Sequence, residues 1–133
     1  MTEFINYVPL RDSWEEIEKR LGITLPKDFK EFVSKYNKGM PIENSFSYEG
    51  GVGFIKELLS FNETSKTNVY RTITDDMKEK RIVPFAFLTN STGDYLSAWY
   101  VCIKGKIVIL YNQKTKEEIF VDHSFFEFIG SLK

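Results

Sequence analysis

The chain has 133 residues, of which 42% are hydrophobic and 28% charged, a composition typical of a globular protein. A chain of this length buries about two-thirds of the surface that its unfolded form exposes, so we expect a single domain over residues 1–133 that needs neither disulfide nor metal ion. Eighteen basic against nineteen acidic residues give a net charge of −1, which disfavours direct binding of nucleic acid because phosphate neutralisation requires a basic surface.

The N-terminus, MTEFINYVPL, has neither a basic start nor an apolar run of signal-peptide length. No stretch approaches the roughly 20 apolar residues of a membrane-spanning helix. We therefore expect a soluble, cytoplasmic protein with no membrane contact. Cys102, the single cysteine, lies in the apolar run AWYVCI, so we expect a buried thiol. Aromatic residues reach 16%, with twelve Phe, and favour a phenylalanine-rich core with some aromatics left for a partner.

Two helices are expected in the first third of the chain. Ser13 and Glu16 form a capping-box pattern, apolar residues then recur at helical spacing to Leu21, and Gly22 can end the helix. Pro26 suits the first position of a second helix, where its missing N–H costs nothing. The apolar stripe of this second helix comprises Phe29, Phe32, Val33 and Tyr36, and Gly39 and Pro41 follow its end.

The middle of the chain is less regular. The run NSFSYEGGVGF is either a loop or a hairpin, and FIKELLSF fits a strand or a short helix, between which periodicity cannot decide. Between Thr67 and Lys80 an apolar stripe predicts a third helix; its members are Val69, Tyr70, Ile73 and Met77.

Four β-branched and aromatic runs, separated by turn residues, predict strands in the last third: RIVPFAFL, DYLSAWYVCI, GKIVILYN and EEIFV. Short connections imply antiparallel pairing. Ser124 and Glu127 then form a second capping box in the closing helix DHSFFEFIGSL. These elements predict an α+β fold in which a single antiparallel sheet is packed with an N-terminal helix pair and a C-terminal helix, mainly on one face.

The sequence lacks the usual catalytic constellations. His123 is the only histidine and Cys102 the only cysteine, so no zinc site of ordinary ligand type can form, and we expect His123 to be exposed. EGGVGF lacks the spacing of a phosphate-binding loop and is expected to be a turn. Asp75 and Asp76 point about 100° apart on a helix, so they cannot jointly flank a substrate bond. We expect no catalytic residue, no metal site and no cofactor, although catalysis by carboxylates alone stays open.

Three segments resemble the SUKH superfamily, the Smi/Knr-type domains. They are IEKRLGITLPKDFKEFVSKYNKG, IVPFAFLTNSTGDYLSAWY and HSFFEFIGSL, which occur in family order and span nearly the whole chain. This chain departs from the family's closing Asn-Gly by carrying Lys38 between Asn37 and Gly39. The resemblance implies structural roles in the hinge, core, turn and closing helix for Leu25, Pro26, Phe29, Phe32, Gly93, Asp94, Phe125 and Phe128.

The resemblance also implies a function. Bacterial members are mostly cytoplasmic immunity proteins that neutralise a cognate toxin, often a nuclease, by binding it, whereas eukaryotic relatives are interaction modules in cell-wall assembly and signalling. The leading hypothesis is therefore an immunity protein that occludes the toxin's active site; the alternative is a scaffold module of the cell-wall type. Direct binding of nucleic acid and enzymatic activity rank below both. Acidic and aromatic candidates for contacting the partner are Glu43, Tyr48, Glu49, Asp75, Asp76, Asp94 and Tyr95.

Overall fold

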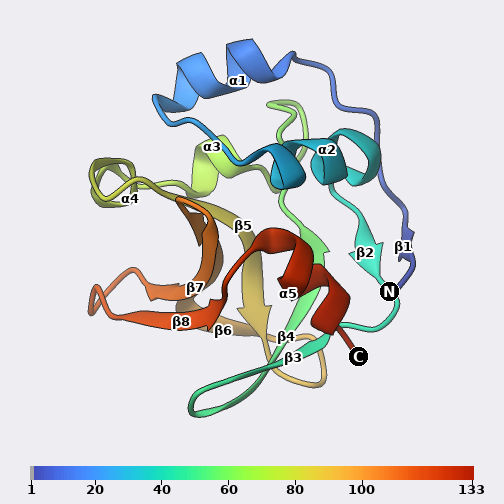
Figure 1. The fold of residues 1–133 in the computed structure, drawn as a ribbon, viewed down its shortest axis with the longest axis vertical. Helices are drawn as coiled ribbons and strands as arrows, with labels where there is room; N and C mark the ends of the chain where they lie inside the picture. The colour runs from blue at the N-terminus through green and yellow to red at the C-terminus, as the bar shows by residue number, and fades with distance from the viewer. Residues whose placement is uncertain (1) are drawn as a thin grey trace.

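A curled antiparallel sheet and the helices that cover one side of it make up the fold (Figure 1). The structure is a computed structural model that describes residues 2–133. Its elements run in the order β1 (Phe4–Ile5), α1 (Trp14–Leu21), α2 (Lys27–Tyr36), β2 (Met40–Pro41), β3 (Ser45–Tyr48), β4 (Gly51–Leu58), α3 (Val69–Thr72), α4 (Asp75–Glu79), β5 (Ile82–Thr89), β6 (Tyr95–Lys104), β7 (Ile107–Asn112), β8 (Glu118–Asp122) and α5 (Phe125–Ser131).

The main sheet has six strands in the order β3-β4-β5-β6-β7-β8, each antiparallel to its neighbour. It curls toward a barrel, so that β3 and β8 approach each other without pairing. The α+β prediction is confirmed, but the prediction of a single sheet is only partly right, because β1 and β2 form a separate two-stranded sheet. Register shifts in β4–β5, β5–β6 and β7–β8 explain the curl, since bulges bend strands and increase twist.

Local capping sets the start and the end of α1 as predicted, whereas α2 begins one residue later than predicted. The Ser13 hydroxyl accepts a hydrogen bond from the Glu16 N–H at 3.2 Å and donates one to the Glu16 carboxylate at 3.0 Å. The reciprocal bond thus goes to the hydroxyl rather than to a backbone N–H. Gly22 ends α1 in the left-handed region at φ 71°. Pro26 lies one position before the start of α2, and its carbonyl accepts from the Lys30 N–H at 3.1 Å.

The prediction of one helix between residues 67 and 80 is wrong, because two short helices occupy this segment. Asn68 caps α3, and Ile73 then leaves the helical conformation at ψ 130°. Thr74 caps α4 through a hydrogen bond from the Met77 N–H of 3.2 Å. The apolar stripe that suggested one helix serves two packing sites, since Val69 enters the main core and Met77 a second cluster on the opposite face of the sheet.

The glycine-rich run forms the β3–β4 hairpin, and FIKELLSF continues β4 as a strand to Leu58. Gly50 adopts φ 117° in the turn. Gly53 serves close packing instead, because a Cβ atom there would lie 2.6 Å from the Phe46 ring and 2.9 Å from Leu88. The glycines therefore shape a hairpin, as the turn prediction for this run requires.

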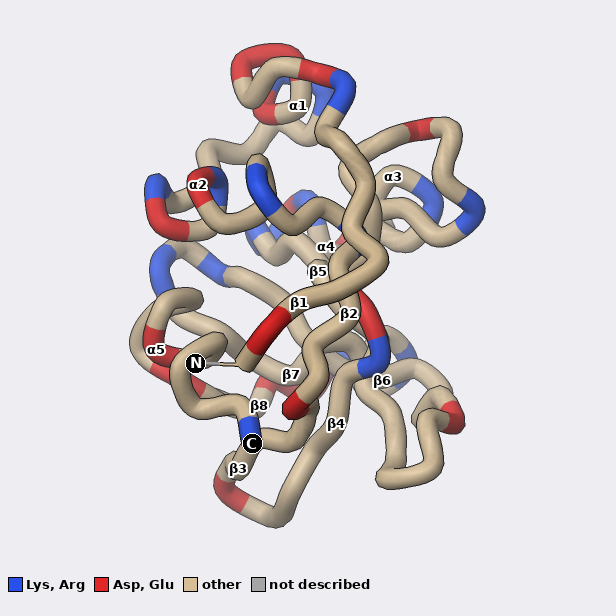
Figure 2. The backbone as a smooth tube through the Cα atoms, turned by 90° about the vertical axis from the view of Figure 1, so that its right-hand side faces the viewer, with Lys and Arg blue, Asp and Glu red and all other residues tan. Residues whose placement is uncertain are grey.

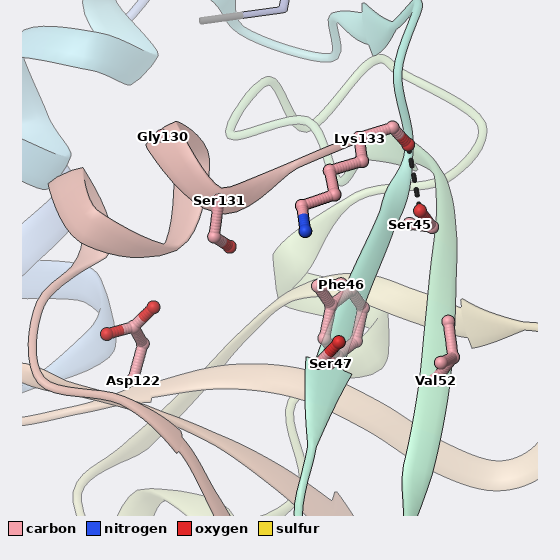
Figure 3. Close-up of a pocket in the computed structure, with 8 residues that line it drawn as sticks. All are labelled: Ser45, Phe46, Ser47, Val52, Asp122, Gly130, Ser131 and Lys133. Carbon is pink, nitrogen blue, oxygen red and sulfur yellow. Dashed lines mark hydrogen bonds between the residues drawn. The ribbon is translucent and has the colours of Figure 1, made fainter.

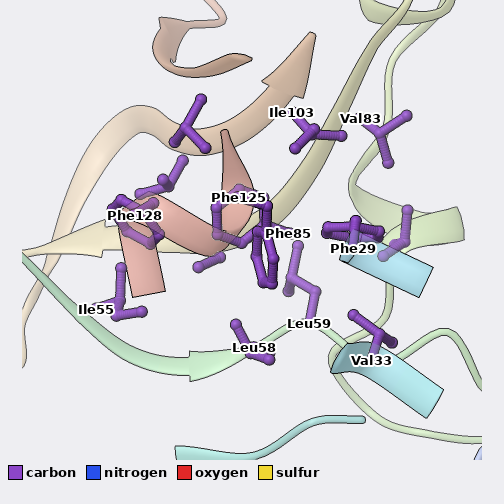
Figure 4. Packing of buried hydrophobic residues seen from close by; sticks show 14 of the residues in the cluster. Phe29, Val33, Ile55, Leu58, Leu59, Val83, Phe85, Ile103, Phe125 and Phe128 are labelled. Carbon is purple, nitrogen blue, oxygen red and sulfur yellow. The ribbon is translucent and has the colours of Figure 1, made fainter. Parts of the chain in front are cut away.

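Phenylalanine rings build the main core between the sheet and the helices (Figure 4). The ring centre of Phe125 from α5 lies 4.8 Å from that of Phe29 in α2 and 5.2 Å from that of Phe85 in β5, both in edge-to-face geometry. Cys102 is fully buried in the second cluster, and burial raises the pKa of its thiol well above the usual value. The predictions of an aromatic core and of a buried thiol are confirmed.

A buried amide closes the turn after α2. The Asn37 side chain accepts from the Phe61 N–H at 2.9 Å and donates to the Ser60 hydroxyl at 3.2 Å. The Asn37 carbonyl accepts from the Val8 N–H at 2.9 Å. One residue thereby ties α2 to the N-terminal segment and to the chain that follows β4.

We expect Asn37→Ala to destabilise the protein by about 1–3 kcal/mol, because the buried Phe61 N–H loses its acceptor. Urea unfolding should show a lower midpoint at an unchanged slope. Thr64→Ala, at an exposed position of the loop that contains Phe61, should change the free energy of unfolding by no more than about 0.5 kcal/mol. Equal stability of the Asn37 variant and the Thr64 control would contradict this account of the turn.

The same substitution at two glycines should have opposite effects. Gly53→Ala places a methyl group against Phe46 and should cost about 1–3 kcal/mol through overpacking. Gly130→Ala, in α5 with open space around its Cα, should stabilise by up to about 1 kcal/mol through helix propensity. Thermal unfolding monitored by circular dichroism measures both effects, and changes of the same sign would refute the packing role of Gly53.

Candidate protein-interaction surface

The usual metal-ligating side chains are not clustered in the described part of the chain. Within residues 2–133, no group of three or more His, Cys, Asp or Glu side chains is placed to hold a metal ion. The exposed ring of His123 lies 5.0 Å from that of Phe120, centre to centre. No helix in this part of the chain is long and apolar enough to cross a membrane.

Four of the predicted contact residues lie at one end of the sheet. Tyr48 and Glu49 are at the tip of the β3–β4 hairpin, and Asp94 and Tyr95 are at the turn between β5 and β6. Because neighbouring strands are antiparallel and Phe54 of β4 pairs with the end of β5, the two turns project from the same end (Figure 1). The β-strand register thus places residues that are far apart in the sequence at the same end of the sheet.

The turn before β6 is held by its own side chains. The Asp94 carboxylate accepts from the Thr92 hydroxyl at 3.0 Å, and the Asp94 N–H donates to the Asn90 side-chain oxygen at 3.0 Å. Asp94 nevertheless remains exposed. It therefore stabilises the turn and also presents a negative charge to solvent.

Apolar side chains accompany these charges. Val52 is 58% exposed and Tyr95 53%, and the Tyr95 ring lies 4.8 Å from Phe87. The hairpin-end surface, as defined here, comprises Tyr48, Glu49, Val52, Asp94, Tyr95 and Leu96. Sequence reasoning missed Val52 and Leu96. Strand alternation from the buried Gly53 would place Val52 on the exposed face, but the sequence left open whether this run was a loop or a hairpin.

Asp75 and Asp76 lie elsewhere, on α4 beside the start of β5. Asp75 is exposed, whereas Asp76 accepts a hydrogen bond from the Tyr111 hydroxyl and lies 3.3 Å from the Lys80 ammonium. This hydrogen bond holds the pKa of the Asp76 carboxyl below its usual value. Burial, followed by the bond to Asp76, raises the pKa of Tyr111. Asp76 is therefore held by partners within the protein, whereas Asp75 is exposed.

Glu43 occupies a third place, next to the N-terminal segment. It is exposed, and its N–H donates to the Thr2 hydroxyl at 2.7 Å. The seven predicted residues therefore fall into three groups rather than one site.

A groove of about 420 Å³ separates β3 from the ends of β8 and α5 (Figure 3). The side chains of Asp122, Ser131 and Lys133 lie around it, and two backbone hydrogen bonds of 3.0 Å join Ser45 to Lys133 at its upper end. Its lining offers serine hydroxyls, an acid and a base, but no activated nucleophile. This groove lies between α5 and the β3–β4 hairpin.

The arrangement as a whole suits recognition of another protein: a stable scaffold, exposed aromatics and rim carboxylates. The family model SUKH_6, described as SMI1-KNR4 cell-wall, matches residues 11–129. The chain belongs to this family. The match confirms the resemblance seen in the sequence and covers every helix start and the main sheet. No curated protein and no solved structure matches the chain significantly.

The Tyr111–Asp76 bond in this SUKH_6 protein should make stability depend on pH. Because the folded-state pKa of Asp76 is lowered, the interaction stabilises the fold above the ordinary Asp pKa and is lost as the pH falls through the folded-state value. Tyr111→Phe should therefore destabilise the protein at about pH 7 and less at about pH 3.

Urea unfolding at the two pH values measures the difference. Tyr100→Phe is the matched control, since the Tyr100 hydroxyl donates to the neutral Gln113 side chain at 2.9 Å. The loss of this hydrogen bond should lower the free energy of unfolding by the same amount at both pH values. An effect of Tyr111→Phe that does not change with pH would show that Asp76 is not its charged acceptor.

Proposed function

We propose that this SUKH_6 protein is a cytoplasmic immunity protein that binds a cognate toxin and occludes the toxin's active site. The observation that carries the proposal is the family match over residues 11–129, joined to the resemblance of the sequence to toxin-neutralising relatives. Neutralisation by binding needs no catalysis, no metal and no cofactor from this chain. Exposed aromatic residues with charged residues around them are typical of surfaces that bind another protein.

The hairpin-end surface is the contact region that we propose first. If the toxin is a nuclease, its substrate groove is basic, and Glu49 and Asp94 would speed association by electrostatic attraction. Tyr48 and Tyr95 would supply contact area. Glu43, Asp75 and Asp76 stand outside this surface and would act at longer range; Asp76 contributes least because Tyr111 and Lys80 already hold its carboxylate.

A second candidate function is a scaffold module for cell-wall assembly. The description of the matching family refers to the cell wall, and the exposed surfaces would serve a non-toxin partner equally well. The gene neighbourhood separates the two, because an immunity gene normally follows a large toxin gene directly.

Co-expression tests the immunity function. The open reading frame upstream would be induced alone and with this protein, and cell survival and co-purification of the pair would be measured. We expect rescue and a stable complex, and weaker complexes for Tyr48→Ala, Glu49→Ala and Asp94→Ala. A toxic neighbour that this protein neither rescues nor binds would exclude the immunity role and favour the scaffold function.

A further inference from the structure

A groove between two helices lies outside the hairpin-end surface. It has a volume of about 280 Å³ and runs between α2 and α5. A second depression of about 290 Å³ adjoins it at the N-terminal segment, and Tyr36 lines both. We name the two together the α2–α5 groove; it is lined chiefly by Glu3, Tyr7, Glu31, Tyr36 and Phe126.

Aromatic rings form a continuous floor along this groove. The ring centre of Phe32 lies 5.4 Å from that of Phe125 and 4.9 Å from that of Tyr36, and Tyr7 stands edge-to-face on Tyr36 at 5.2 Å. Phe126 at the rim is 72% exposed. A solvent-exposed phenylalanine beside an aromatic floor is the composition of an interface anchor rather than of an ordinary surface.

The position of Phe126 is fixed by the fold. Its neighbours Phe125, Phe128 and Ile129 are buried, so α5 must turn Phe126 outward. The Phe126 N–H donates to the Asp28 carboxylate at 3.1 Å, which fastens the start of α5 to α2. An anchor held in place loses little conformational freedom on binding.

Acidic groups dominate the rim. Asp28, Glu31 and Glu3 line the groove together with one base, Lys35, whose ammonium lies 5.5 Å from the centre of the Tyr36 ring. A second base of α2, Lys27, lies 3.8 Å from the Glu31 carboxylate. Figure 2 shows acidic positions directly before β1 and shortly after β2, both on the side that faces the viewer. Glu43 joins them, since its N–H is bonded to Thr2, which lines the second depression. The groove is therefore apolar in its floor and negative at its edges.

These properties select the occupant. Each depression is slightly smaller than the roughly 300–1,000 Å³ typical of small-molecule sites, but has room for protein side chains. Face-to-face docking of a second copy would bring the same carboxylates together, and like charges oppose such pairing. A segment of another protein with apolar side chains flanked by Lys or Arg fits the groove, because its apolar side chains can pack on the aromatic floor and its basic side chains can pair with the carboxylates of the rim.

We propose that a basic–apolar segment of the toxin docks in the α2–α5 groove with Phe126 as its main anchor, a proposal that rests on the immunity function. One partner can reach this groove and the β3–β4 hairpin together. Both α5 and the hairpin lie toward the viewer in Figure 1 and on the left in Figure 2, with the groove of Figure 3 between them. A standard interface covers about 800 Å² on each partner, enough for such a span.

The test measures binding of the toxin encoded upstream to the full-length protein by surface plasmon resonance. Phe126→Ala should weaken affinity at least about tenfold, mainly through faster dissociation. Phe120→Ala is the matched control: Phe120 is also an exposed phenylalanine, at 47%, but lies on β8 away from the groove. Glu31→Lys should slow association and weaken its dependence on salt.

The outcomes separate the two proposals. If the wild-type protein binds the toxin and Phe126→Ala binds it as tightly, the proposed docking in the α2–α5 groove is wrong while the immunity function stands. Equal losses of affinity for Phe126→Ala and Phe120→Ala would have the same meaning. No binding by the wild-type protein would overturn both. Circular dichroism of each variant confirms that the exposed substitutions leave the fold unchanged.

Discussion

The buried side chain of Asn37 is the interaction on which the helical half of this structure depends. The side-chain amide of Asn37 accepts from the Phe61 N–H and donates to the Ser60 hydroxyl. The backbone carbonyl of Asn37 accepts from the Val8 N–H and so holds the N-terminal segment. An unpaired amide at this depth would cost more than its hydrogen bonds contribute, so the turn has little freedom to change. Gly39 completes the turn because a Cβ there would lie 2.9 Å from a backbone oxygen. Asn37 and Gly39 are thus explained by the hydrogen bonds and the close packing of this turn.

The buried residues build a scaffold, and the candidate contact surfaces lie on side chains that this scaffold turns outward. Phe125 and Phe128 bury α5, which leaves Phe126 exposed at the groove edge. The close approach of Gly53 to Phe46 sets the hairpin that carries Tyr48 and Glu49.

Local signals predicted what local physics decides. The caps at Ser13 and Ser124 set helix starts correctly, because the stabilising bonds span only three residues. The apolar stripe from Val69 to Met77 wrongly predicted one helix, because Asn68 and Thr74 each cap a separate short helix. The curl of the sheet arises from bulges, and the placement of Glu49 and Asp94 at the same end of the sheet arises from long-range register. Neither is encoded in a short run of sequence.

The account claims that family residues hold the scaffold while one partner covers α5 and the β3–β4 hairpin. Hydrogen–deuterium exchange of the protein, alone and bound to the toxin encoded upstream, tests this most directly. We expect the Phe61 amide to be strongly protected in both states, and new protection on binding to be confined to the two proposed contact surfaces, which are α5, the end of α2, residues 3–7, residues 45–52 and residues 94–96. New protection confined to α4 and the outer strands β7 and β8, or rapid exchange of the Phe61 amide in the free protein, would contradict the account.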